Sequence, residues 1–135
     1  MWADPLGNGK YRLDNIPLFA YDVNLGDVFL AKTLDGDTRP YFDKILQRSG
    51  NRTFRLTLAE SLSSDAAERI SDAKVALEGI CNGSSRYGSE YFVYSVPPQI
   101  ETSAIEGLLD EGEDDGLWSW ELSTDDEGRH QIATL

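Results

Sequence analysis

The chain has 135 residues, of which 40% are hydrophobic and 10% aromatic, a composition typical of one globular domain and not of a disordered chain. Its formal net charge of −12 disfavours non-specific attraction to nucleic acid or to an anionic membrane surface. No apolar run approaches the roughly 20 residues of a membrane-spanning helix, so we expect neither a nucleic-acid nor a membrane partner.

Charge is distributed unevenly along the chain. Residues 1–58 carry eight Lys or Arg against seven Asp or Glu, whereas residues 59–135 carry four against seventeen. Folding does not require this asymmetry, because a surface of mixed charge is equally soluble. The imbalance indicates either an electropositive partner or an acidic surface that does not bind a partner. A single cysteine, Cys81, excludes an internal disulfide and favours a reducing, cytoplasmic environment.

The first half is predicted to form short strands joined by tight turns. Pro17 limits the first strand to a sheet edge or end, because its nitrogen cannot donate to a ladder. The glycine-containing turns at 35–37 and 49–51 favour hairpins. In the last strand apolar and polar residues alternate, as they do when one face is buried. We expect a meander of four strands at residues 10–17, 28–33, 40–47 and 52–58.

The second half begins with a predicted long helix and a central strand. Ser64 or Asp65 is suited to cap the helix, Glu68 would complete a capping box with Asp65, and Asn82-Gly83 is a typical stop. Residues 90–96 are apolar on both faces, as in the middle of a sheet. The helix is predicted from one apolar stripe at spacings of three and four, formed by Ala66, Ile70, Ala73, Leu77 and Ile80.

A shorter helix and a closing strand complete the pattern. Thr102 or Ser103 is suited to cap this helix, and a strand at 117–122 follows it. A short extra strand near 84–87 would give the order β-α-β-β-α-β of a ferredoxin-like fold. We therefore expect a single compact α+β domain at 1–122, with an antiparallel strand meander at 1–58, a ferredoxin-like (split β-α-β) half at 53–122, and a polar C-terminal tail at 123–135.

Several motifs of the first half follow one another in a recognisable order. They are Trp2-Ala3, Asn15-Ile16-Pro17, Gly26-Asp27, and the Ser49-Gly50 turn with Thr53. Over residues 2–56 the chain resembles a family of small bacterial proteins that is catalogued as domain of unknown function 4265. The resemblance implies a cytosolic α+β protein and supplies no established activity.

Each motif also has a structural explanation, which we favour. Asp14 and Asn15 can bond backbone groups where Pro17 interrupts the ladder, and Gly26-Asp27 is typical of a turn. The turn Ser49-Gly50-Asn51 suits a hairpin. An alternative is that its backbone N–H groups hold an anion beside the basic residues Arg48, Arg52 and Arg55.

Residues suited to catalysis are few. His130 is the only histidine and falls in the predicted tail, where no packed scaffold would fix it in a Ser-His-Asp or Cys-His arrangement. Cys81 follows the apolar helix stripe and is expected to be a buried, inert thiol. The acidic segment 110–116 lacks the ligand spacing of an EF-hand loop. A carboxylate pair or a carboxylate-bound Mg²⁺ stays open, but we expect no catalytic residue, no metal and no cofactor.

The acidic second half carries the main functional hypothesis. Carboxylates lie close in sequence to two tryptophans, and this combination suits a basic protein partner, because charge speeds encounter and aromatic contacts supply affinity. Small acidic bacterial proteins of this size often serve as immunity proteins. We expect a non-enzymatic inhibitor that neutralises a basic toxin or effector domain. The candidate partner-binding residues are Glu106, Asp110, Glu111, Glu113, Asp114, Asp115, Trp118 and Trp120.

Other functions remain open at this point. A ferredoxin-like sheet can bind a small molecule, act as a regulatory module, or form a homodimer through an exposed edge or face. An enzyme that uses carboxylates of the meander is a third alternative. Trp118 and Trp120 on one strand face are also typical of core packing, so their exposure distinguishes a binding surface from a core.

Overall fold

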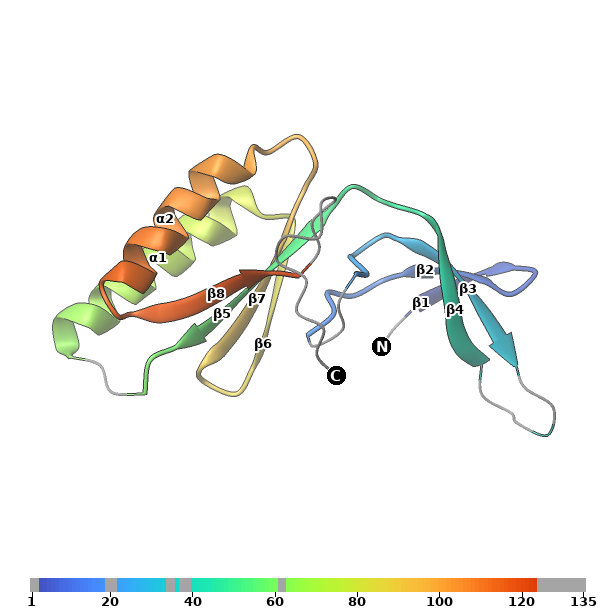
Figure 1. Ribbon diagram of the computed structural model, residues 1–135, viewed down its shortest axis with the longest axis horizontal. Coiled ribbons are helices and arrows are strands. Elements are labelled where there is room, and N and C mark those ends of the chain that lie inside the picture. The colour runs from blue at the N-terminus through green and yellow to red at the C-terminus, as the bar shows by residue number, and fades with distance from the viewer. Residues whose placement is uncertain (1–2, 19–21, 34–35, 37–39, 61–62, 124–135) are drawn as a thin grey trace.

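The computed structural model describes residues 3–18, 22–33, 36, 40–60 and 63–123, which form two antiparallel sheets and a pair of helices (Figure 1). The first sheet has the strand order β1-β2-β3-β4, and the second has the order β6-β7-β5-β8. The elements are β1 (Ala3–Gly7), β2 (Lys10–Leu13), β3 (Val28–Thr33), β4 (Pro40–Gln47), β5 (Arg52–Leu58), α1 (Ser64–Ile80), β6 (Gly83–Tyr87), β7 (Tyr91–Val96), α2 (Thr102–Asp114) and β8 (Trp118–Leu122).

The first sheet is the predicted antiparallel meander, but its strands differ from the prediction. Ala3–Gly7 adds a strand that pairs with Lys10–Leu13. Arg52–Leu58 does not pair with Pro40–Gln47; it lies in the second sheet, between β7 and β8. The chain therefore passes from one sheet to the other after β4, and the prediction of a hairpin at residues 49–51 was wrong. The predicted hairpin at 35–37 lies outside the described residues, apart from Gly36.

The second sheet and the two helices confirm the ferredoxin-like prediction. The elements follow one another as β5-α1-β6-β7-α2-β8, and all neighbouring strands pair antiparallel. The short strand expected near residue 84 is present as β6. Strand β7 is central, and five of its six residues are buried, as its continuous apolar sequence predicted. Both helices cover the same face of this sheet (Figure 1).

The core lies between the helix layer and the second sheet. Ile70, Ala73 and Leu77 of the predicted stripe are buried, whereas Ile80, at the end of α1, is 39% exposed. No helix in the described part of the chain is long and apolar enough to cross a membrane. The larger side chains that fill this core include Phe54, Leu56, Ile70, Leu77, Phe92, Tyr94, Ile105, Leu109, Trp118 and Leu122.

The helix ends depart from the sequence prediction. The residue that caps α1 is Ser63, whose Oγ accepts a hydrogen bond from the backbone N–H of Ala66 at 3.1 Å, and not Ser64 or Asp65. Helix α2 begins after Glu101, which makes no side-chain cap bond, so neither Thr102 nor Ser103 is its cap. Of the acidic segment 110–116, residues 110 to 114 belong to the C-terminal end of α2. The spacing of apolar residues predicts where a helix lies. Its first residue depends on which side chain accepts the hydrogen bonds of the free N–H groups at the helix start.

Candidate functional site

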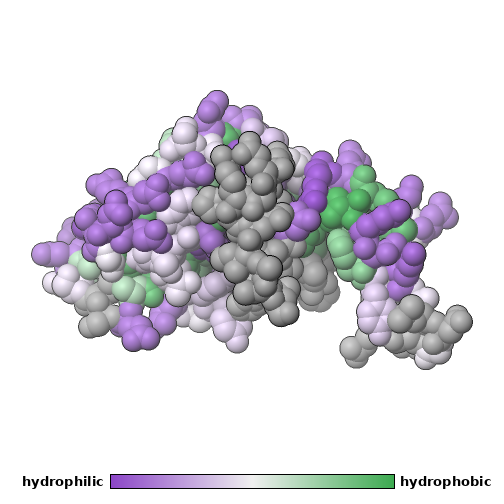
Figure 2. Space-filling view, in the orientation of Figure 1, coloured by the Kyte–Doolittle hydropathy of each residue, from purple (hydrophilic) through white to green (hydrophobic). Residues whose placement is uncertain are grey.

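The outer surface of α1 and α2 is strongly acidic. The two helices carry nine Asp or Glu against two basic residues, Arg69 and Lys74. Figure 2 shows hydrophilic residues gathered over this part of the molecule. Six of the eight predicted partner-binding residues lie on α2 or at its C-cap, Asp115. The structure therefore brings the acidic candidates together on one helix.

Trp118 belongs to the core and is not an exposed anchor. Its side chain is 5% exposed, and its indole Nε1 donates to the carbonyl oxygen of Leu109 at 2.9 Å. The ring lies against Gly112, where any Cβ would overlap the indole. Only glycine at this position lets α2 approach β8 so closely. The interpretation of Trp118 as an exposed contact residue was wrong, because its indole fills the space between the second sheet and α2.

Trp120 is half-buried and ties β8 to the end of α2. Its indole Nε1 donates to a carboxylate oxygen of Asp110 at 3.0 Å, and its backbone N–H donates to Glu113 at 3.2 Å. The ring also packs 5.9 Å from that of Phe54. Because β8 is an edge strand, the Glu113 carboxylate occupies a donor that a foreign strand would otherwise use. Asp110 and Glu113 therefore have a structural role within the chain.

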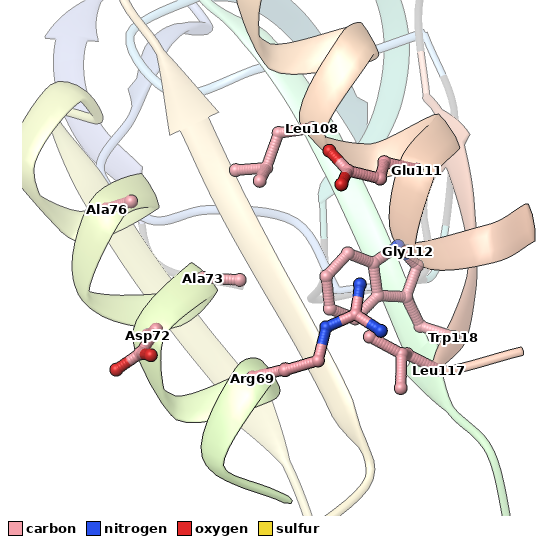
Figure 3. Close-up of a pocket in the computed structure, with 9 residues that line it drawn as sticks. All are labelled: Arg69, Asp72, Ala73, Ala76, Leu108, Glu111, Gly112, Leu117 and Trp118. Atoms are coloured by element: carbon pink, nitrogen blue, oxygen red, sulfur yellow. The ribbon is translucent and has the colours of Figure 1, made fainter. Parts of the chain in front are cut away.

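A groove of about 300 Å³ opens between the two helices (Figure 3). Small residues line its two walls, Ala73 and Ala76 on α1 and Gly112 on α2, and they let the helices lie close to the sheet. Sequence reasoning missed this groove, although a glycine inside a predicted helix signals close packing. The remaining lining residues are Arg69, Asp72, Leu108, Glu111, Leu117 and Trp118.

One end of the groove is bridged by an ion pair between the helices. Arg69 reaches from α1 to Asp115, with Nη2 2.6 Å from the carboxylate, and both side chains are about half exposed, 48% and 46%. Figure 3 shows the Arg69 side chain extending across from α1 toward α2. An exposed pair of this kind contributes little to stability, about 0–1 kcal/mol. It does remove Asp115 from the carboxylates that are available to a partner.

Three predicted carboxylates remain available. Glu106, Glu111 and Asp114 make no hydrogen bond or ion pair within the described part of the chain. Glu111 also lines the groove, so one of these charges stands beside its apolar floor. The arrangement can attract a cationic surface and receive one of its side chains.

The family-like motifs meet at the junction of the two sheets. Asp27 is fully buried, and its carboxylate accepts from the backbone N–H groups of Asn24 at 2.9 Å and Ser49 at 2.7 Å. The Thr53 hydroxyl donates to the side-chain oxygen of Asn24 at 2.6 Å. These buried bonds connect the Gly26-Asp27 turn to the segment that enters β5. They give the Gly26-Asp27 motif and the Ser49-Gly50 turn with Thr53 a structural role, whereas no bond from the Asp14 side chain to the backbone accompanies them in the described part of the chain.

The crossover at residues 49–51 is held by its own polar groups. The Ser49 N–H bonds Asp27, and the Asn51 N–H bonds the Ser49 hydroxyl at 3.1 Å. Both Ser49 Oγ and Asn51 Nδ2 donate to the carbonyl oxygen of Leu25, at 2.6 and 2.7 Å. Gly50, with φ of 88°, lies against Pro98. The N–H groups of Ser49 and Asn51 are engaged within the chain, which is inconsistent with the anion-cradle alternative.

Arg55 is a second departure from the sequence prediction. The alternation through β5 predicts an exposed polar face, but Thr53 and Arg55 are 0% and 2% exposed. The Arg55 guanidinium donates to the carbonyl oxygen of Pro17 at 3.0 Å and lies 3.9 Å from Glu121. The segment around Pro17 therefore covers this face. Arg55 also lines a pocket of about 320 Å³ with Thr57, Tyr91, Ser119, Trp120 and Glu121.

Cys81 lies at the end of α1 and is partly buried. Burial, with a smaller effect from Glu78, raises the pKa of its thiol to about 11. The thiol is therefore protonated at neutral pH and is a weak nucleophile. No group of three His, Cys, Asp or Glu residues in the described ranges is arranged to hold a metal ion. His130 lies outside those ranges.

Comparison with known proteins supports the fold and the family. A hypothetical protein from Neisseria gonorrhoeae has a similar structure, with a TM-score of 0.70 and 21% sequence identity over 90% of this chain and 79% of that chain. A comparison with curated proteins finds no relative. The family model described as "Domain of unknown function (DUF4265)" matches residues 1–120, so it covers the first sheet, the junction motifs, both helices and the second sheet as far as Trp120 in β8. On that match, the chain belongs to the DUF4265 family.

Proposed function

We propose that the chain is a non-enzymatic binding protein whose two-helix face binds a basic protein. The observation that carries this proposal is the groove between α1 and α2, where an apolar floor lies beside carboxylates. Opposite charge speeds the encounter of two proteins, and an apolar pocket that loses its water on binding supplies affinity. Both features occur on the same face here.

The partner that fits this face is a basic toxin or effector domain, which the chain would neutralise as an immunity-type inhibitor. The support is electrostatic. Helices α1 and α2 carry nine carboxylates and only two basic residues, and one of the two basic residues, Arg69, is already paired with Asp115. A partner that buries its basic surface on the helices would lose access to its own anionic substrate. Inhibition then follows from binding alone.

The test is a binding measurement with the basic protein encoded next to this chain in its host. Glu111→Lys combined with Asp114→Lys reverses two carboxylates that make no internal bond, so the fold should be retained. We expect the association rate to fall about tenfold or more and its salt dependence to weaken. Stopped-flow or surface plasmon resonance at two salt concentrations measures both effects.

A matched control changes the same charge elsewhere. Asp4→Lys with Asp14→Lys alters two exposed carboxylates of the first half and should leave the association rate within about twofold of the wild type. Equal slowing by both double variants would show that only net charge matters. That result, or unchanged binding by the helix variant, would exclude the two-helix face as the interface.

A second candidate function is a small-molecule-binding or regulatory module, favoured by the pocket beside Arg55. The buried Arg55 lines it together with Thr57 and Ser119, a set suited to a small carboxylate or phosphate ligand that would replace Glu121 as the partner of the guanidinium. Thermal unfolding in a panel of such metabolites tests this function, because a bound ligand raises the Tm. Thr57→Trp, which fills the pocket, should abolish any such increase.

A further inference from the structure

The first sheet leaves its faces exposed in the described part of the chain. Both helices lie over the second sheet (Figure 1). Among the described side chains of β1 to β4, only Leu13 and Val28 are buried. Figure 2 shows a hydrophobic patch at the surface of the lobe that these strands form. A sheet usually buries one face, so an exposed patch of this kind marks an interaction site.

One face of the first sheet carries a row of aromatic rings that ends at β4. Tyr11 lies opposite Phe29, and their stacked rings are 5.7 Å apart. Phe29 lies opposite Ile45, and its ring is 5.3 Å from that of Phe42. The Phe42 residue is 52% exposed. The row therefore stops at an uncovered aromatic on the outermost strand.

Strand β4 is the edge of this sheet and is eight residues long. Tyr41 and Leu46, like Phe42, are large apolar residues that are more than 40% exposed. A long, apolar and exposed edge strand is a template for pairing with another strand. Pairing is specific when the sequence of the second strand is complementary to that of β4.

The sequence of β4 is complementary to itself. We infer that β4 pairs antiparallel with β4 of a second copy of this chain, about a two-fold axis between Asp43 and Lys44. In this register Asp43 lies opposite Lys44 of the second copy, Phe42 opposite Ile45, and Tyr41 opposite Leu46. Opposite charges then meet twice at the centre, and apolar pairs flank them. A two-fold contact of this kind closes as a dimer and does not propagate.

The faces of the two copies also match. Phe42 and Ile45 lie opposite Ala31 and Phe29, which are alternate residues of β3, so both belong to the aromatic face. A two-fold axis perpendicular to the sheet places the aromatic faces of both copies on the same side of the combined sheet. The two rows of aromatic rings then become continuous across the dimer. The register of β4 shifts at Asp43 and Leu46, where each strand has an extra residue. Because both copies of β4 have the same two extra residues, the paired strands are equal in length and stay in register.

Asp43 already has one cationic neighbour in its own chain. The Nζ atom of Lys32 lies 3.3 Å from its carboxylate, and the Lys32 side chain is 65% exposed. In the dimer the carboxylate would lie between this lysine and Lys44 of the second copy. The contact does not involve α1 or α2, so it is independent of the proposed function.

Sedimentation velocity over a concentration series tests the dimer. We expect the wild type to dimerise reversibly. Lys44→Asp places like charges opposite each other at both central positions and should raise the dimer dissociation constant about tenfold or more. The double variant Asp43→Lys/Lys44→Asp restores opposite charges across the axis. It should recover most of the wild-type affinity, because opposite charges again lie opposite each other across the axis. A general effect of net charge is tested separately by Lys10→Asp, which changes the net charge by the same amount as Lys44→Asp.

Lys10→Asp is the matched control. Lys10 and Lys44 both lie opposite Leu30, so they share a face, but Lys10 is on the inner strand β2 and should not affect dimerisation. Circular dichroism confirms that each variant is folded. A wild type that is monomeric at every concentration would overturn the inference. So would a dimer that the single and double variants weaken equally, because that pattern indicates packing through the sheet face without this register.

Discussion

At the scale of single residues, the contact between Gly112 and Trp118 controls how α2 sits on the second sheet. A methyl group at position 112 would overlap the indole ring, which cannot move away because its Nε1 is bonded to Leu109. Gly112→Ala should therefore lower the free energy of unfolding by about 1–3 kcal/mol, despite the better helix propensity of alanine. Urea denaturation measures this loss.

Gly107 supplies the matched control on the same helix. It is exposed, and a Cβ there would meet nothing within 4 Å. Gly107→Ala should stabilise the protein by about 0.5–1 kcal/mol, because alanine is the better helix former and restricts the unfolded chain. Equal effects of the two substitutions would show that α2 does not pack on Trp118 as closely as the structure indicates.

At the scale of elements, the start of α1 tests the cap that the structure assigns. Ser63→Ala removes the hydroxyl that accepts from the Ala66 N–H, so it should destabilise the protein by about 1 kcal/mol. Ser64, which sequence spacing also favours as the cap, is exposed at the first helical position. Ser64→Ala should change the stability by less than about 0.5 kcal/mol. A larger loss for Ser64→Ala than for Ser63→Ala in thermal or urea unfolding would contradict the assigned boundary.

The elements themselves differ in how well sequence predicts them. The order of strands and helices after residue 52 follows from periodicity, and β7 could be placed at the sheet centre because both of its faces are apolar. Periodicity could not reveal that Arg55 is buried, because its cover comes from Pro17, far away in sequence. The same limit hid the crossover at residues 49–51, since a turn that joins two sheets has the same composition as a hairpin.

The predicted site shows a similar division. Its carboxylates were expected together, and helical geometry does place them on α2. Which of them are available to a partner depends on tertiary contacts, since Asp110 and Glu113 hold Trp120 while Asp115 pairs with Arg69. The burial of Trp118 likewise depends on a glycine of the preceding helix, and the pattern of β8 alone does not reveal it.

At the scale of the whole molecule, the excess acidic charge and the core lie in the same half. The described side chains of the second sheet and its helices form the main hydrophobic cluster, whereas Leu13 and Val28 are the buried side chains of the first sheet's strands. The turn that holds Asn24 and Asp27 is connected to the chain that enters β5 by two hydrogen bonds, from the Ser49 N–H to Asp27 and from the Thr53 hydroxyl to Asn24. A sheet with so little buried apolar surface is stabilised mainly by this junction.

We therefore expect the two sheets to open at different free energies. Native-state hydrogen exchange, at protein concentrations low enough to avoid pairing of β4, should show the slowest amides in β5 and β7 and faster exchange in β2 and β3. Asp27→Ala leaves the buried N–H of Asn24 and the partly buried N–H of Ser49 without their acceptor, at a cost of about 1–3 kcal/mol. It should accelerate exchange in β2 and β3 more than in β7, while Asp14→Ala, at an exposed position, should change neither. Equal acceleration in both sheets would mean that the molecule unfolds as one cooperative unit, with the junction as part of its single core.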